Sequence, residues 1–277
     1  LTLWLMRGLA PEPAVQGSPK IDSPGAVLCT LGLGGTVFAL IEQPSYGWGS
    51  PAIWLPLICG LLLLVSFVWY ERRTPQPMLP LSLFKRRNFS VGNIATAAIY
   101  GGLSIATFLI VIYLQQVGGF SALHAGIALL PVTVVMFLLS PRFGALAGRT
   151  GPRLFMALGP MVAAGGFLLM LRVRPELVYL TQLLPGVLLF ALGLSMTVAP
   201  LTAAILGDVD TGRAGVASAV NNAVSRIAGL ITVAALGLIT GPHLSPVGFR
   251  RALIATAILM TTGGIISLIG IRNPHRA

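Results

Sequence analysis

Residues 52–70 read AIWLPLICGLLLLVSFVWY and carry no charged side chain. The hydrocarbon core of a bilayer is about 30 Å thick, so a helix needs about 20 consecutive apolar residues to cross it. Residues 61–65 are Leu-Leu-Leu-Leu-Val, without the alternating polarity that a transmembrane β-strand requires. This stretch therefore predicts a membrane-spanning α-helix. Similar stretches recur at 25–42, 91–114, 121–140, 153–172, 177–206, 214–240 and 250–271.

The composition of the whole chain agrees with this prediction. Of the 277 residues, 55% are hydrophobic and 9% are charged, whereas soluble domains average about 25% charged residues. Mean hydropathy is +0.88. These values exclude a soluble enzyme, a disordered chain and a disulfide scaffold, and they predict an all-α, polytopic membrane protein that lies in the lipid bilayer.

The basic residues predict an orientation. An excess of 18 Lys and Arg over 7 Asp and Glu could suggest nucleic-acid binding. The basic residues fall between the apolar runs, however, where they orient helices, so we expect no nucleic-acid partner. Eight spans place both termini on one side, and most basic residues lie on that side. We therefore expect a multi-pass protein of the cell (plasma) membrane with both termini cytoplasmic.

Polar interruptions divide the chain into five parts. We expect a cytoplasmic segment at 1–24, a helix pair at 25–70, a basic cytoplasmic linker at 71–90, a six-helix bundle at 91–271 and a cytoplasmic tail at 272–277. Residues 1–6 look like the last turn of a helix whose beginning is missing, so we expect the chain to be a fragment. Many transporters are built from six-helix halves.

Ionisable groups inside the spans are few, and such groups are functional candidates because they are costly in a membrane. Arg226 lies well inside a span. It could be a gate or substrate-path cation, or it could reach the inner surface or pair with Asp208 or Asp210. Glu42 and Glu71 lie at helix ends, where we expect them to be solvated. No Asp or Glu lies at the centre of a span, so a proton-coupling group would lie outside this chain.

Two clusters of uncharged polar residues lie within the spans. Asn93, Thr96, Tyr100, Ser104 and Thr107 repeat every three or four residues and share one helix face. A second cluster contains Asn221, Asn222 and Ser225. Either cluster could line a solute path or form hydrogen bonds between helices, and both interpretations stay open.

Motifs for enzymatic chemistry are not found. The sequence contains no metalloprotease, nucleophile-elbow or phosphate-loop motif. Cys29 and Cys59 lie in apolar runs without metal-ligand spacing. We therefore expect no enzymatic activity, no metal and no cofactor.

The loop at residues 144–153, GALAGRTGPR, resembles the cytoplasmic signature of the major facilitator superfamily, which lies between the second and third helices of a half. It occupies the same place in the six-helix unit of this chain. Gly148 stands where the family often has an Asp that takes part in an inner charge network.

Two further stretches are similar to the 14-helix drug:proton antiporters of that superfamily. Residues 78–89, MLPLSLFKRRNF, look like the linker before their last six helices, and residues 207–226 look like their thirteenth helix and the loop before it. The resemblance implies that residues 25–70 match the extra helix pair and residues 91–271 the C-terminal half. The N-terminal six helices, with their membrane acids, would be missing.

The resemblance implies a C-terminal part of a multidrug efflux transporter that works by alternating access. Its partners would be an amphipathic small molecule, protons and the missing N-terminal six-helix half. The expected substrate path contains Asn93, Thr96, Tyr100, Asn221, Asn222 and Ser225. The expected cytoplasmic gate contains Gly144, Arg149, Gly151, Arg153, Asp208, Arg213 and Arg226. The alternative is a truncated, non-transporting membrane protein, or a module that needs a six-helix partner.

Overall fold

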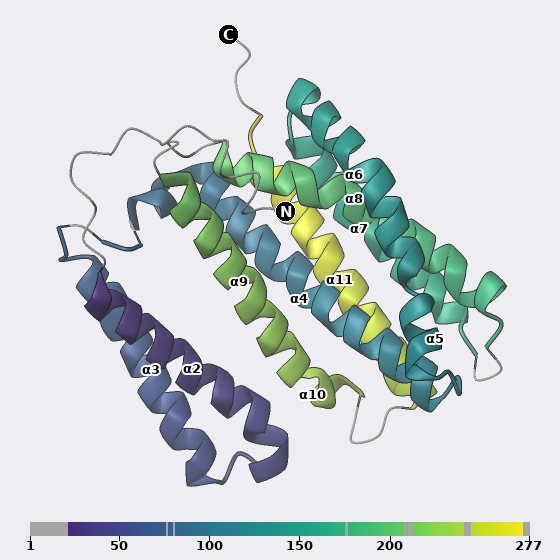
Figure 1. Ribbon diagram of the computed structural model, residues 1–277, viewed down its shortest axis with the longest axis horizontal. Coiled ribbons are helices and arrows are strands. Elements are labelled where there is room, and N and C mark those ends of the chain that lie inside the picture. The colour runs from purple at the N-terminus through teal and green to yellow at the C-terminus, as the bar shows by residue number, and fades with distance from the viewer. Residues whose placement is uncertain are drawn as a thin grey trace, which may run out of the picture.

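The computed structural model describes residues 22–273, apart from 76, 80, 175–176, 208, 210–212 and 241–244. In this part of the chain every regular element is helical, and eight helical stretches are long and apolar enough to cross a membrane (Figure 1). The predicted all-α membrane fold is confirmed. The main helices are α2 (Ser23–Tyr46), α3 (Pro51–Glu71), α4 (Arg87–Gln116), α5 (Ala122–Ile127), α6 (Leu130–Thr150), α7 (Arg153–Leu169), α8 (Leu184–Leu206), α9 (Ala214–Ala234), α10 (Leu236–Thr240) and α11 (Pro246–Gly270). Short 3₁₀ turns lie at η1 (Leu81–Lys85) and η2 (Met170–Arg172), and a π-helical turn, η3 (Tyr179–Leu183), leads into α8.

Two of the predicted spans are each divided into two α-helices. The span expected at 121–140 is divided into α5 and α6, and α6 continues to Thr150 through the internal Pro141. Membrane helices tolerate an internal proline because neighbouring groups satisfy the freed carbonyl. Residues 144–150 are therefore the last turns of a helix and not a loop as expected. The span expected at 214–240 is divided into α9 and α10 at Ala235.

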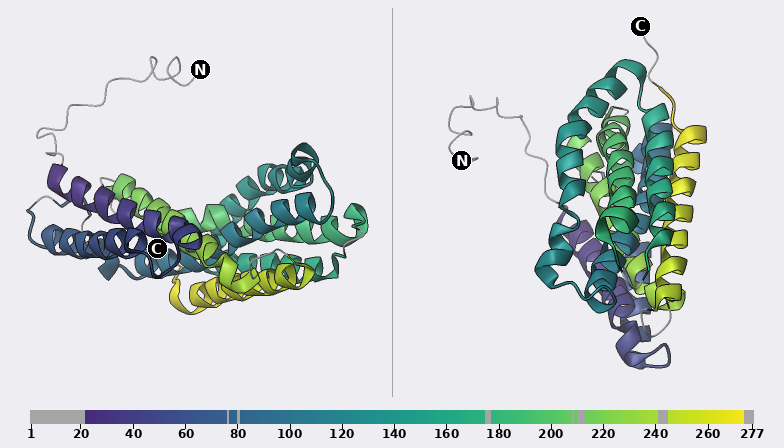
Figure 2. Two further views of the ribbon diagram at one scale, coloured as in Figure 1. Left: turned by 90° about the horizontal axis from the view of Figure 1, so that it is seen from below. Right: turned by 90° about the vertical axis from the view of Figure 1, so that its right-hand side faces the viewer.

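Helices α4, α6, α7, α8, α9 and α11 form one bundle, in which they run side by side (Figure 2). Helix α4 packs against α9 and α11, α7 packs against α8 and α11, and α6 packs against α8. Helices α6 and α9 lie at opposite edges of the bundle (Figure 1). Their buried residues are few, with Ala147 in α6 and Ala217 and Gly229 in α9.

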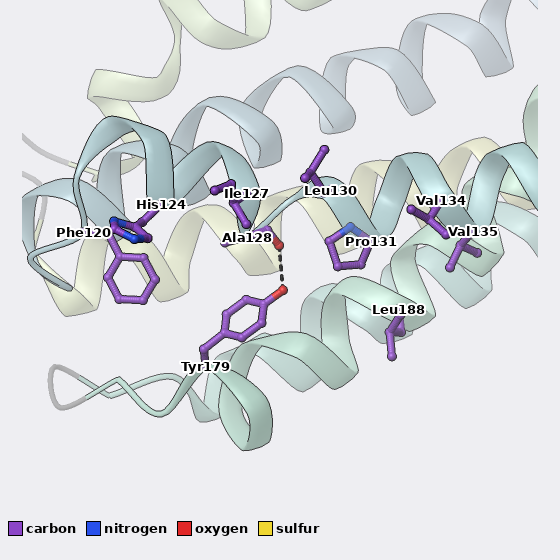
Figure 3. Close-up of a pocket in the computed structure, with 10 residues that line it drawn as sticks. All are labelled: Phe120, His124, Ile127, Ala128, Leu130, Pro131, Val134, Val135, Tyr179 and Leu188. Atoms are coloured by element: carbon purple, nitrogen blue, oxygen red, sulfur yellow. Dashed lines mark hydrogen bonds between the residues drawn. The ribbon is translucent and has the colours of Figure 1, made fainter.

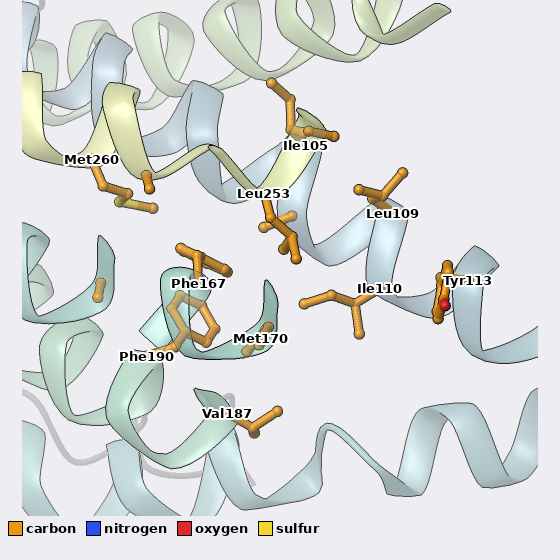
Figure 4. Packing of buried hydrophobic residues seen from close by; sticks show 14 of the residues in the cluster. Ile105, Leu109, Ile110, Tyr113, Phe167, Met170, Val187, Phe190, Leu253 and Met260 are labelled. Atoms are coloured by element: carbon orange, nitrogen blue, oxygen red, sulfur yellow. The ribbon is translucent and has the colours of Figure 1, made fainter. Parts of the chain in front are cut away.

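Aromatic and aliphatic side chains fill the core between α4, α7, α8 and α11 (Figure 4). Tyr113 of α4 stacks on Phe249 of α11, with 3.9 Å between the ring centroids, and Phe167 of α7 meets Phe190 of α8 at 4.8 Å. A second cluster closes the other end of the bundle. It contains Leu83, Phe89, Met156, Leu201, Ala204, Ile205, Ala217 and Ile271.

Glycines allow α7 and α8 to touch backbone to backbone. A Cβ on Gly166 would lie 2.6 Å from the amide nitrogen of Phe190, and one on Gly193 would lie 2.5 Å from the carbonyl oxygen of Gly159. Lipid tails are as apolar as leucine, so close van der Waals packing of small residues holds membrane helices together. This crossing fixes the position of α8, against which α6 packs.

Helices α2 and α3 form a hairpin that lies beside the bundle and contacts it through α2 and α9. The hairpin turn contains Gly47 at φ 73°, and Ser50 caps α3 through the backbone N–H of Ala52. The expectation that Glu71 is solvated is wrong, because its side chain is 3% exposed. The chain after α3 folds back, and the Leu79 N–H donates to the Glu71 carboxylate at 2.9 Å.

One end of the bundle is rich in arginine, and we call it the basic end. It contains the starts of α4, α7 and α9 and the ends of α6, α8 and α11. Its basic residues are Lys85, Arg86, Arg87, Arg149, Arg153, Arg213 and Arg272.

Candidate functional site

A groove of about 560 Å³ with polar and apolar lining residues runs between α4 and α9. It is lined by Tyr100, Leu103, Ser104, Thr107, Asn222, Ser225, Arg226, Gly229, Leu230 and Val233. A smaller hollow of about 200 Å³ adjoins it and shares Tyr100, Asn222 and Ser225 with it. Of the six residues predicted to line a solute path, the structure therefore brings four together at these two cavities, since Asn221 lines the smaller one.

The two helices approach closely beside the groove. A Cβ on Gly229 would lie 2.5 Å from the Ser104 hydroxyl oxygen, so a larger residue there would force the Ser104 side chain to move. One turn further along α9, the Thr232 hydroxyl donates to the Gly101 carbonyl at 2.9 Å. The polar side chains of α9 that precede Gly229 lie near each other along the groove. Leu230 and Val233 supply apolar surface. Such a mixed lining suits an amphipathic small molecule.

Arg226 is exposed on this groove and lies near the middle of α9. Its guanidinium makes no hydrogen bond or ion pair with any residue in the described ranges. The sequence placed Arg226 with the gate residues, but the structure places it beside the path residues Asn222 and Ser225. An unpaired cation within a span is costly, so this face of α9 is suited to a negatively charged or hydrogen-bonding group.

Asn93 and Thr96 lie behind the groove and do not line it. They are 4% and 0% exposed, and both accept hydrogen bonds from the Asn221 side-chain amide, at 3.3 Å and 2.8 Å. Thr96 also donates to the Gly92 carbonyl, and the Asn93 amide donates to the Phe89 carbonyl. This cluster therefore joins α4 to α9, which is the inter-helix alternative that the sequence left open.

We expect Asn221→Leu to destabilise the α4–α9 contact. The change removes both donors and leaves the Asn93 side-chain oxygen buried without a partner. Each inter-helix hydrogen bond in a membrane protein contributes about 0.6 kcal/mol, so the total loss should be on the order of 1–2 kcal/mol. Thermal unfolding in detergent would measure it. Asn222→Leu is the matched control, since Asn222 is exposed; equal losses in the two variants would contradict the assignment.

A second constellation, at the basic end, joins α6, α7 and the residues after α11. Gly151 separates α6 from α7 at φ 94° and ψ 153°, a backbone conformation that is essentially confined to glycine. The Asn273 side chain lies where a Cβ of Gly151 would be. Its oxygen accepts from the Arg153 N–H at 3.1 Å, and its amide donates to the Thr150 carbonyl at 3.4 Å. We call this set the tail clamp.

Arginine side chains complete the clamp by capping α11. The side chain of Arg87 donates to the carbonyls of Gly270 at 2.7 Å and Ile269 at 3.2 Å, and Arg153 donates to Leu268 at 2.8 Å. The last carbonyls of a helix carry partial negative charge and attract cations. Asn88 pairs with the backbone of Arg272 through both its amide and its oxygen, each at 2.9 Å.

The residues predicted to form a gate lie in separate places. Gly151 and Arg153 meet in the tail clamp. Gly144 packs α6 on α8, where its Cβ would lie 3.2 Å from Ala199. Arg149 is exposed in the last turn of α6, and Arg213 reaches the Ser82 hydroxyl at 3.5 Å. Asp208 lies outside the described residues.

An apolar pocket of about 640 Å³ lies at the other end, beside the break between α5 and α6 (Figure 3). It is lined by Phe120, His124, Ile127, Ala128, Leu130, Pro131, Val134, Val135, Tyr179 and Leu188. Because the helix is interrupted, the Ala128 carbonyl is free to accept from the Tyr179 hydroxyl at 2.8 Å (Figure 3). The sequence predicted one continuous span here, and ordinary apolar residues gave no signal for a pocket.

Sequence reasoning also missed Asn88 and Asn273. Each is a single asparagine next to arginines outside the predicted spans, and such positions usually face solvent. The only sequence signal for this cluster was Gly151, which indicates a turn. It does not indicate which side chain packs against that turn.

The comparisons with known proteins agree with the fold. Residues 25–233 match the family model described as Major Facilitator Superfamily. The chain is 32% identical over 228 residues to the puromycin resistance protein pur8 of Streptomyces alboniger, covering 80% of this chain and 44% of that protein. It is 30% identical over 249 residues to the multidrug resistance protein Stp of Mycobacterium tuberculosis, covering 88% and 45%. It is also 30% identical to the methylenomycin A resistance protein of Bacillus subtilis, covering 91% and 54%. The chain thus spans about half the length of the curated relatives that it matches.

Proposed function

Because the chain belongs to the major facilitator superfamily, we propose that it is the C-terminal part of a transporter that exports drugs or other amphipathic small molecules in exchange for protons. The observation that carries this proposal is the α4–α9 groove, where Tyr100, Asn222, Ser225 and Arg226 line one cavity in an otherwise apolar bundle. The names of the relatives, which refer to resistance against puromycin, several drugs and methylenomycin A, support the substrate class.

The proposed orientation places the basic end in the cytoplasm, by the excess of basic residues at that end. The tail clamp would then hold α6, α7 and α11 together at the cytoplasmic surface. In alternating access, a bundle of this kind rocks as a rigid body around a site near the bilayer midplane. A clamp that ties three helices at one end supports such motion of the bundle as a unit.

The groove would be completed by a second six-helix half. Helices α6 and α9, at the two edges of the bundle, bury few of their own residues. The relatives are about twice as long as this chain. On this proposal, Arg226, which has no partner among the described residues, faces the second half or the bound molecule. The membrane carboxylate that couples transport to protons comes from that half, because the residues lining the groove include no Asp or Glu.

An efflux assay tests the proposal. The chain would be expressed in cells without their own pumps, alone and together with the N-terminal half of the puromycin resistance protein, and loaded with a fluorescent cationic dye. We expect no efflux from the chain alone. We expect efflux that a protonophore abolishes when the second half is present.

A groove variant makes the assay specific to this site. Asn222→Leu should remove most of the efflux, because it replaces a polar lining residue with a larger apolar one. Phe137→Leu is the control, since Phe137 is 81% exposed on α6 and lies away from the groove. Dye export that is as fast in Asn222→Leu as in the unchanged chain would refute the groove as the path.

A further inference from the structure

Two carboxyl groups meet at the basic-end side of the α2–α3 hairpin, away from the groove and the tail clamp. Asp22 precedes α2 and caps it, and Glu71 is the last residue of α3. One oxygen of each group accepts a backbone N–H. Asp22 Oδ1 accepts from Gly25 at 3.0 Å, and Glu71 Oε2 accepts from Leu79 at 2.9 Å.

The other two oxygens, Asp22 Oδ2 and Glu71 Oε1, are buried and have no hydrogen-bond partner among the described residues. They converge over Gly25, where a Cβ would lie 2.5 Å from Asp22 Oδ2 and 2.8 Å from Glu71 Oε1. Because both atoms lie within 2.8 Å of that one position, the two oxygens lie close together. Two ionised carboxylates have only acceptors, so they could not satisfy each other and would repel.

One bound proton would remove the repulsion between the two carboxyl groups. When one carboxyl is protonated, its O–H donates to the facing oxygen, and both buried atoms gain a partner. Like charges that share a buried site favour one proton between them. We propose that Asp22 and Glu71 form a proton-binding site in which one shared proton joins the two buried oxygens and thereby closes the basic end of the α2–α3 hairpin.

Among the residues that the structure describes, no basic side chain forms an ion pair with Asp22 or Glu71. Arg72 and Arg73 follow Glu71 and are both exposed, and the Arg73 guanidinium lies over the Trp69 ring at 4.1 Å from its centroid. Helix α9, which packs on α2, has Arg213 at this end, and Arg213 reaches Ser82. Within the described ranges, the thiol of Cys29 on α2 also interacts electrostatically with Glu71.

Releasing the proton should loosen the hairpin. With both groups ionised, repulsion over Gly25 would separate the start of α2 from the end of α3. The site would therefore make the packing of α2 on α3 sensitive to pH on the side of the membrane that the basic end faces. This property does not depend on the transported molecule or on a second half.

Infrared spectroscopy of the purified chain in lipid nanodiscs tests the proposal. At a pH just above the ordinary titration range of exposed carboxyls, about 4, the chain should show a protonated-carboxyl C=O band that disappears as the pH is raised further. Asp22→Asn and Glu71→Gln should each abolish that band, because the remaining carboxyl can then ionise. Glu42→Gln, half-buried towards the other end of α2, should leave the band unchanged. A spectrum without this band, or a band that survives in both single variants, would overturn the proposal.

Labelling with dicyclohexylcarbodiimide, which reacts with protonated carboxyls in apolar surroundings, gives an independent readout. Mass spectrometry should find the adduct on Asp22 or Glu71 at the pH where the band is present and several-fold less at alkaline pH. Labelling of Glu71 in Asp22→Asn should fall several-fold as well. If Asp22→Asn does not fold, Gly25→Ala replaces it, since the added methyl separates the two oxygens. Labelling that is insensitive to pH and to these variants would refute the shared proton.

Discussion

Replacing Gly193 with alanine should prevent α7 and α8 from packing and leave little folded protein. The added Cβ would meet the backbone of α7 at Ala163 and at Gly159. Backbone atoms cannot move aside as a side-chain end can, so the two helices must separate. Overpacking of a close contact typically costs about 1–3 kcal/mol. Alanine is favoured over glycine in a helix interior by up to about 1 kcal/mol, which is too little to compensate.

The effect should spread beyond the pair, because α6 packs on α8 and α11 packs on α7. Size-exclusion chromatography in detergent and thermal unfolding would measure the loss of monodisperse protein. Gly34→Ala is the matched control, since a Cβ at Gly34 in α2 would meet no atom within 4 Å. Gly34→Ala should be neutral or slightly stabilising. Similar unfolding temperatures for the two variants would show that the crossing is less tight than described.

The positions of the spans were predictable from the sequence, because a bilayer demands long apolar runs whatever surrounds them. All eight predicted spans correspond to helices. The break between α5 and α6 and the continuation of α6 to Thr150 were not predictable. Polar and turn-forming residues such as Gly148 and Arg149 also occur in the last turns of a membrane helix, where the side chains reach the interface.

Lateral contacts were less predictable than spans. Helical spacing placed Asn93, Thr96 and Tyr100 on one face of α4. It could not tell which of them face α9 and which face the groove, because both surfaces accept polar groups. The carboxylate of the buried Glu71 accepts from the backbone N–H of Leu79. That contact joins two residues that are eight positions apart in the sequence. No helical or strand periodicity predicts such a contact.

Gly151→Ala should open the tail clamp. At φ 94° and ψ 153°, an alanine carries a backbone penalty of about 1–3 kcal/mol. Its Cβ would also occupy the position of the Asn273 side chain, so the bonds from Asn273 to Arg153 and Thr150 would be lost. We expect lower thermal stability and faster hydrogen exchange in the last turn of α11, which the clamp holds against α7.

Gly148→Ala separates this effect from a general intolerance of substitution in the same segment. Gly148 lies three residues earlier, in helical conformation, and a Cβ there would meet no atom within 4 Å. We expect Gly148→Ala to leave stability unchanged or raise it by up to about 1 kcal/mol, since it replaces an exposed helical glycine.

A double-mutant cycle with Asn273→Ala isolates the collision from the backbone penalty. Truncating Asn273 removes the atoms that the new methyl would strike, while the demand for a positive φ remains. Gly151→Ala should therefore destabilise the Asn273→Ala chain less than it destabilises the unchanged one. Independent sites add within about 0.5 kcal/mol, so a coupling above that value supports the clamp. Strict additivity would mean that Asn273 does not occupy the space beside Gly151, and that the positive φ alone explains the glycine.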